Sequence, residues 1–210
     1  MTTSKDHLDI TKHKGGDRTQ KYISQNPIEK FLVTNFLSQV HKLVIKSAPN
    51  TIHEVGCGEG QIISKILNDK YSILGSDISE KCLALAEKEL SSKLNVSLIN
   101  ADIYKLNPIN HSADLVICCE VLEHLSNPEE AMKILSSITK KYLILSVPRE
   151  PIWRILNLMR FKYFNSLGNT PGHLQNWSRK KFIQFVSSYM NIDMIKSPLP
   201  WTILLCRPKI

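Results

Sequence analysis

The seven residues Glu-Val-Gly-Cys-Gly-Glu-Gly at positions 54–60 decide the fold prediction for this chain. They overlap the end of Thr-Ile-His-Glu-Val (51–55), which has the β-branched and apolar composition of a short strand. Gly56, Gly58 and Gly60 then follow at alternate positions. Glycine lets the backbone turn tightly and approach a ligand, while amides at the next helix start face that ligand. The stretch therefore predicts a strand, a ligand-binding turn and a helix.

Short apolar runs alternate with helical patterns along the rest of the chain, which is typical of βαβ units. Strands this apolar fit a sheet that is covered on both faces. We predict an α/β fold with a Rossmann-like, seven-stranded, mostly parallel sheet and helices on both faces. The expected strands are residues 51–55, 71–76, 95–100, 113–119, 141–147, 192–197 and 201–207, and the expected helices are 27–46, 61–69, 80–92, 128–138 and about 178–190.

The length of 210 residues allows one domain, expected at 27–210, with a mobile polar leader at 1–26 and a substrate-side insertion at about 148–177. No apolar run approaches the roughly 18 residues that a membrane helix needs, so we expect no integral membrane segment. The polar N-terminus lacks the apolar centre of a signal peptide, which favours a cytoplasmic protein. The five cysteines form no Cys-x-x-Cys pair, so we expect reduced, buried thiols.

The net charge of +8 is concentrated in one segment. Residues 51–139 hold 7 Lys and Arg against 13 Asp and Glu, whereas residues 140–181 hold 9 basic residues against Glu150 alone. Such a segment indicates an anionic substrate, nucleic acid or an anionic lipid, or else a solvated basic face.

Acidic residues close the next two predicted strands. Asp77 follows the glycine turn by about 20 residues, where a carboxylate can accept both hydroxyls of a ribose, and Asp102 closes the third strand. Two kinds of site fit this pattern, one for a nicotinamide dinucleotide and one for S-adenosylmethionine. The dinucleotide fingerprint G-x-G-x-x-G would need glycine where Gln61 stands, which favours S-adenosylmethionine.

The set "EVGCGEG", "GSDIS" (75–79), "NADIY" (100–104) and "ADLVICCEVLEHL" (113–125) resembles the class I S-adenosylmethionine-dependent methyltransferases over roughly residues 50–147. The resemblance implies that Asp77 holds the ribose of the cofactor and that Asp102 accepts from the adenine amino group. It places the remaining cofactor residues along the methionine and around the adenine: Glu54, Gly56, Cys57, Gly58, Ile78, Ile103 and Cys119.

Two carboxylates and an imidazole follow the fourth predicted strand. On a helix, Glu120, Glu123 and His124 would share one face and could coordinate a divalent cation such as Mg²⁺ or Mn²⁺. The stretch resembles two metal-using groups, the small-RNA terminal 2′-O-methyltransferases and the ubiquinone-biosynthesis O-methyltransferases. The first group places a further metal-ligand histidine four residues before a Trp-Thr/Ser-Arg run, and here His173 stands four residues before Trp177. A metal site and a structural or general-base role both fit these residues.

The insertion supplies the candidate substrate residues: Arg149 as an anion contact, Trp153 on a lid or membrane-surface helix, and His173 and Trp177 in the substrate wall. We expect catalysis by Glu120, Glu123, His124 and His173 in an O-methyltransferase for a small-molecule hydroxyl, with an anionic or lipid-like substrate. The alternatives are a methyltransferase for the terminal ribose of RNA and a non-catalytic cofactor-binding subunit.

Overall fold

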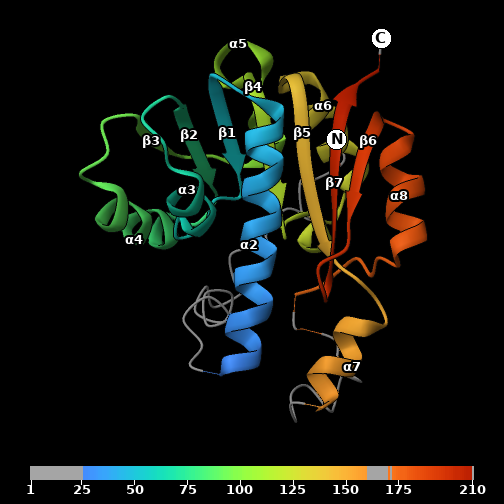
Figure 1. Cartoon of the computed structure of the whole chain (residues 1–210). Coiled ribbons are helices and arrows are strands. Elements are labelled where there is room, and N and C mark those ends of the chain that lie inside the picture. The colour runs from blue at the N-terminus through green and yellow to red at the C-terminus, as the bar shows by residue number, and fades with distance from the viewer. Residues whose placement is uncertain (1–25, 160–169, 171, 210) are drawn as a thin grey trace, which may run out of the picture.

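The computed structural model describes residues 26–159, 170 and 172–209. The leader expected at 1–26 therefore lies outside the described residues except for Asn26, which caps the first described helix. Seven strands form one sheet, as predicted, and their order is β3-β2-β1-β4-β5-β7-β6 (Figure 1). Their bounds are β1 Thr51–Val55, β2 Ser72–Asp77, β3 Val96–Asn100, β4 Ala113–Cys119, β5 Thr139–Pro148, β6 Met190–Lys196 and β7 Trp201–Pro208.

The first five strands are parallel to one another, while β7 runs antiparallel to both of its neighbours. The carboxyl ends of the parallel strands therefore share one edge of the sheet with the start of β7. The strand order reverses between β1 and β4, and in open α/β sheets this switch point is where ligands bind.

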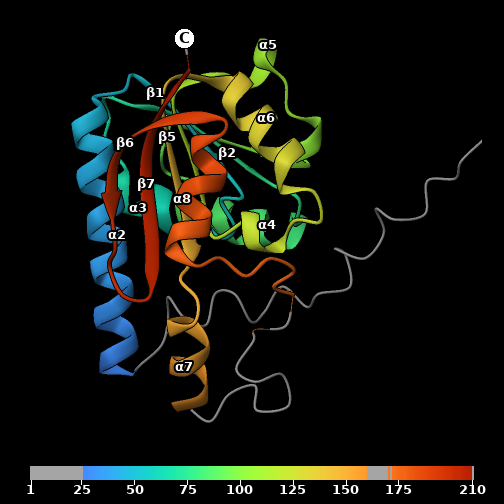
Figure 2. The ribbon, with the colours of Figure 1, turned by 90° about the vertical axis from the view of Figure 1, so that its right-hand side faces the viewer.

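Helices cover both faces of the sheet, as predicted (Figures 1 and 2). The helices α2, α3 and α4 share a hydrophobic cluster with one face, and α6 and α8 share a second cluster with the other. The helical bounds are α2 Pro27–Ser47, α3 Gln61–Ile66, α4 Glu80–Leu90, α5 Pro108–His111, α6 Pro128–Ile138, α7 Ile152–Met159 and α8 Arg179–Ser187, with 3-10 turns η2 Ile103–Lys105 and η3 Leu122–His124.

Strand β4 shows why the apolar runs form central strands. Leu115 and Ile117 lie in the first cluster and Val116 and Cys118 in the second, and all four are fully buried. A period of two with apolar residues on both faces fits only a strand that is covered on both sides.

Helix α7 extends beyond the carboxyl edge of the sheet and belongs to the predicted insertion (Figure 1). Among the described residues, no helix is long and apolar enough to cross a membrane.

Candidate functional site

The glycine turn after β1 adopts the backbone that its sequence requires. Gly56, Gly58 and Gly60 have φ of 77°, 53° and 79°, the left-handed region that other residues rarely adopt. At Gly56 space is also limiting, because a Cβ atom there would lie 2.3 Å from Cγ2 of Val121, just beyond β4. The turn therefore brings the β1 and β4 ends into close approach at the switch point.

Asp77, the last residue of β2, is bonded to this turn through both carboxylate oxygens. Oδ2 accepts from the Gly58 N–H and Oδ1 accepts from the Ser79 N–H, each at 2.8 Å. Each carboxylate oxygen carries more than one acceptor site, so the half-buried side chain can still receive hydroxyl donors from a ligand.

The end of β3 supplies the next polar group. Asp102 Oδ1 accepts from the Tyr104 N–H at 3.0 Å and caps η2, so the carboxylate is fixed at the sheet edge. Two apolar side chains accompany the acids: Ile78 is 46% exposed directly after β2, and Ile103 is buried. A ring bound at this edge would meet apolar faces and an acceptor together.

Glu54 lies buried within β1, and its Oε2 has no hydrogen-bond partner among the described residues. Burial raises the pKa of Glu54 well above its usual range, and the neighbouring Asp77 charge raises the pKa further. This shift favours the protonated form of the side chain, which can donate to a ligand. Burial also raises the thiol pKa of Cys57 and of Cys119, so both are packing residues and not nucleophiles.

The prediction of a helix that carries Glu120, Glu123 and His124 on one face is wrong. Strand β4 ends at Cys119, Glu120 has a φ of 61°, and only the short turn η3 follows, at Leu122–His124. The left-handed residue changes the chain direction, so Glu120 does not share a face with the other two. The true helix, α6, begins at Pro128 after the Asn127 cap.

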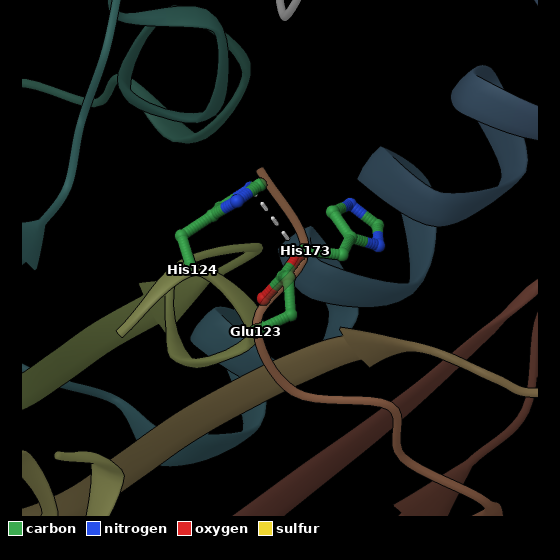
Figure 3. A group of neighbouring side chains, drawn as sticks. All are labelled: Glu123, His124 and His173. Atoms are coloured by element: carbon green, nitrogen blue, oxygen red, sulfur yellow. Dashed lines mark ion pairs between the residues drawn. The ribbon is translucent and has the colours of Figure 1, made fainter. Parts of the chain in front are cut away.

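The structure nevertheless brings Glu123 and His124 together with His173 (Figure 3). One ligand atom from each residue lies within 4.8 Å of the others, and the His124 and His173 rings meet edge to face at 4.9 Å. Glu123 is buried and the two histidines are partly buried. The Nε2 atom of His124 lies 3.9 Å from Oε1 of Glu123.

The tautomer of His124 follows from its backbone partner. Nδ1 lies 2.8 Å from the carbonyl oxygen of Gly172, which can only accept, so Nδ1 carries the proton. Nε2 is then left with a lone pair, which can accept a proton or bind a cation.

Backbone hydrogen bonds hold the segment that carries His173 against η3. The Leu174 and Gln175 N–H groups donate to the carbonyl oxygen of Glu123 at 2.8 and 2.9 Å, and the Gln175 side chain donates to the carbonyl oxygen of Leu125. Residues about 50 positions apart in sequence are thus joined at the site.

Glu120 has other partners than this cluster. Its Oε1 accepts from the Ser146 hydroxyl at 3.0 Å and its Oε2 from the Trp201 indole N–H at 2.7 Å. The carboxylate therefore links β4, β5 and β7 beside the cluster. No local signal in the sequence identified Trp201, because its role depends on a contact with a residue 81 positions away.

The predicted substrate residues occupy three different places. The Trp153 ring stacks on His173 with centroids 6.2 Å apart, so it borders the cluster. Arg149 is partly buried and lies directly beyond β5, where its backbone N–H donates to the carbonyl oxygen of Pro200. Trp177 packs against Phe182 and Phe185 of α8, which indicates a core role for that ring.

A family model described as "Methyltransferase domain" matches residues 53–144. The small RNA 2′-O-methyltransferase of Arabidopsis thaliana is 28% identical over 81% of this chain, and the match covers 20% of the plant protein. The ubiquinone biosynthesis O-methyltransferase of Azoarcus sp. is 30% identical over 44% of this chain and 41% of that protein.

Solved structures share the fold. Magnesium protoporphyrin IX methyltransferase from Synechocystis PCC 6803, crystallised with bound S-adenosylhomocysteine, superimposes with a TM-score of 0.68 at 20% identity. The match covers 88% of each chain. At this identity the likeness concerns the fold. The matches span 20% and 41% of the lengths of the two curated relatives named above.

Proposed function

We propose that this chain, which contains a class I S-adenosylmethionine-dependent methyltransferase domain, transfers the methyl group to a hydroxyl oxygen, with the 2′-hydroxyl of a terminal RNA ribose as acceptor. The observation that carries the proposal is the grouping of Glu123, His124 and His173 beside the glycine turn.

The extent of the relatives' similarity favours RNA as the acceptor. The small RNA 2′-O-methyltransferase match covers 81% of the chain and thus extends well beyond the matched domain at 53–144. A small-molecule hydroxyl is the second candidate, supported by the ubiquinone-biosynthesis relative, whose match covers 44%.

The cofactor would lie across the carboxyl edge from β1 to β3. We assign the ribose hydroxyls to Asp77, the adenine to Ile78, Ile103 and Asp102, and the methionine end to Glu54 and the glycine turn. The lone pairs that Asp77 keeps and the raised pKa of the buried Glu54 support this assignment. Gly56, Gly58, Cys57 and Cys119 would line the pocket through backbone and small side chains.

The residues present fit a divalent cation. Donor atoms around one ion lie roughly 3 to 4.4 Å apart when each binds at about 2.0–2.2 Å, and the three candidate ligands already lie within 4.8 Å of one another. Glu123, His124 through Nε2, and His173 would hold the ion. Two imidazoles and a carboxylate suit Mn²⁺ better than Mg²⁺, which prefers oxygen ligands. When bound, the cation would lower the pKa of the acceptor hydroxyl.

Methyl transfer needs an oxygen nucleophile in line with the methyl carbon and sulfur. The acceptor oxygen forms a bond to the methyl carbon while the carbon–sulfur bond breaks, and sulfur leaves with its electron pair as the neutral thioether of S-adenosylhomocysteine. The hydroxyl proton must leave as well: without a cation, His124 Nε2 would take it, whereas with Nε2 bound to the cation the proton would pass to solvent. Trp153 and the segment around His173 would border the acceptor and exclude water.

Calorimetry tests the cofactor part of the proposal directly. S-adenosylmethionine should bind the wild-type chain, and Asp77→Ala should weaken binding by tenfold or more, because it removes the acceptor of both ribose hydroxyls. Absence of binding to the wild type would exclude the enzyme.

Periodate oxidation tests the acceptor. Periodate cleaves a terminal ribose that carries both hydroxyls, whereas methylation of the 2′-oxygen protects it. RNA incubated with the chain, the cofactor and Mn²⁺ should become resistant, and His124→Gln should abolish the protection. His41→Gln, on α2, is the matched control. Methylation of a catechol without protection of RNA would favour the small-molecule candidate, and full turnover in excess chelator would exclude the metal.

A further inference from the structure

Trp201 lies between the two segments that carry the cluster. It is the first residue of β7, pairs with Pro148 of β5, and is 3% exposed. Its ring packs against Phe36 of α2, with centroids 4.8 Å apart, so one side of the indole is fixed by the helical layer.

The first segment meets Trp201 through Glu120. The indole N–H donates to Oε2 of Glu120 at 2.7 Å, and Ser146 donates to Oε1. The Glu120 N–H also donates to the carbonyl oxygen of Ser146, so backbone and side chain are both held. Hydrogen bonds to a carboxylate are roughly twice as strong as those between neutral groups. Because only Val121 separates Glu120 from η3, the position of Glu120 sets where Glu123 and His124 point.

The second segment meets Trp201 through Trp153. The two indole rings lie 6.0 Å apart, and the Trp153 ring lies against His173. The indole N–H of Trp153 donates to the Thr170 hydroxyl at 2.8 Å, and the backbone N–H of His173 donates to the Thr170 carbonyl oxygen at 3.1 Å. A rigid aromatic row thus runs from Trp201 to His173.

We propose that Trp201 is a positioning residue that sets the separation between Glu123 and His124 on one segment and His173 on the other. It contacts both segments, whereas the residues of the cluster would contact the cation or the acceptor. The inference rests on the proposed function insofar as the cluster binds a cation. Loss of groups that orient metal ligands typically costs 10- to 100-fold in metal affinity.

The test makes the same substitution, tryptophan to phenylalanine, at two positions of the full chain and measures Mn²⁺ affinity without cofactor. Trp201→Phe keeps an aromatic ring but removes the N–H that holds Glu120, and we expect the Mn²⁺ dissociation constant to rise about tenfold. Trp177→Phe is the matched control, because the indole N–H of Trp177 has no hydrogen-bond partner among the described residues. It should leave Mn²⁺ affinity within about twofold of wild type. Equal affinities for Trp201→Phe and wild type, or equal losses in the two variants, would overturn the inference.

Histidine NMR in the metal-free chain separates this inference from the metal proposal. If wild type binds no Mn²⁺, the metal part of the proposed function fails, but Trp201→Phe should still shift the ring signals of His124 and His173 together. Unchanged signals for both rings would contradict a positioning role. Should Trp201→Phe fail to fold, Glu120→Gln retains an acceptor for the indole but loses the charge. It should still shift the ring signals of both histidines relative to wild type, and unchanged signals would overturn the inference.

Discussion

Replacing Gly56 with alanine should test two requirements of the glycine turn, a left-handed backbone and the absence of a side chain. Gly56→Ala puts a side chain at a φ of 77° and a Cβ 2.3 Å from Cγ2 of Val121. The left-handed backbone costs about 1–2 kcal/mol, and forcing a methyl into occupied space about 1–3 kcal/mol more. We expect a loss of roughly 2–5 kcal/mol in the free energy of unfolding.

Gly58→Ala is the matched control, because Gly58 has a φ of 53° and a Cβ there would meet nothing within 4 Å. Only the backbone term of about 1–2 kcal/mol should remain. Val121→Ala removes the clashing atom, so the double variant with Gly56→Ala should recover about 1–3 kcal/mol relative to the sum of the single changes.

Urea unfolding of the four variants and the wild type gives these energies, and calorimetry gives the cofactor affinity of each. Because Gly56 lies at the switch point, Gly56→Ala should also weaken S-adenosylmethionine binding more than Val121→Ala does. The steric reasoning is refuted if Gly58→Ala costs as much as Gly56→Ala, or if the double variant is simply additive.

Three further predictions concern stability and the cofactor site. Burial lowers the pKa of His53 from 6.5 to about 4, so the unfolded chain takes up the proton first and stability should fall by about 2 kcal/mol between pH 7 and pH 5. His53→Gln should reduce that pH dependence in urea unfolding, and an unchanged slope would contradict the assignment. Asp77→Asn keeps one oxygen, so its cofactor affinity in calorimetry should lie between those of wild type and Asp77→Ala; an affinity equal to wild type would count against the ribose contact. Trp177→Ala should cost about 3 kcal/mol in unfolding free energy, because its ring packs on α8; an unchanged stability with lost turnover would instead place it in the substrate wall.

Periodicity predicted the sheet because local sequence carries that information. In β4 the apolar residues recur on both faces, and Asn127 followed by Pro128 marks the start of α6. The same cap could have corrected the predicted helix at Glu120, since a helix that begins at Pro128 leaves the preceding residues to a connection. A left-handed glutamate, however, carries no sequence signal.

The part of the candidate site that depends on strand ends was predictable from topology. His173 was predicted at the cluster only through a family resemblance, and the role of Trp201 was not predicted. Asp77 ends β2 and Asp102 follows the end of β3 by two residues, so topology alone places them at one edge. The approach of His173 to His124 rests instead on Gly172 and on the backbone bonds to Glu123. The separation of Glu120 from the cluster depends on Trp201, which pairing of β7 with β5 brings to the edge.

The reversed direction of β7 has a practical consequence for handling the protein. Since β7 begins at the carboxyl edge of the sheet, its last residues lie at the opposite edge, away from α7 and the glycine turn (Figure 1). A fluorophore, affinity handle or surface tether attached after Lys209 would therefore be held about a strand's length from the glycine turn. Immobilising the chain through those residues would leave the carboxyl edge of the sheet accessible to an acceptor as large as an RNA duplex.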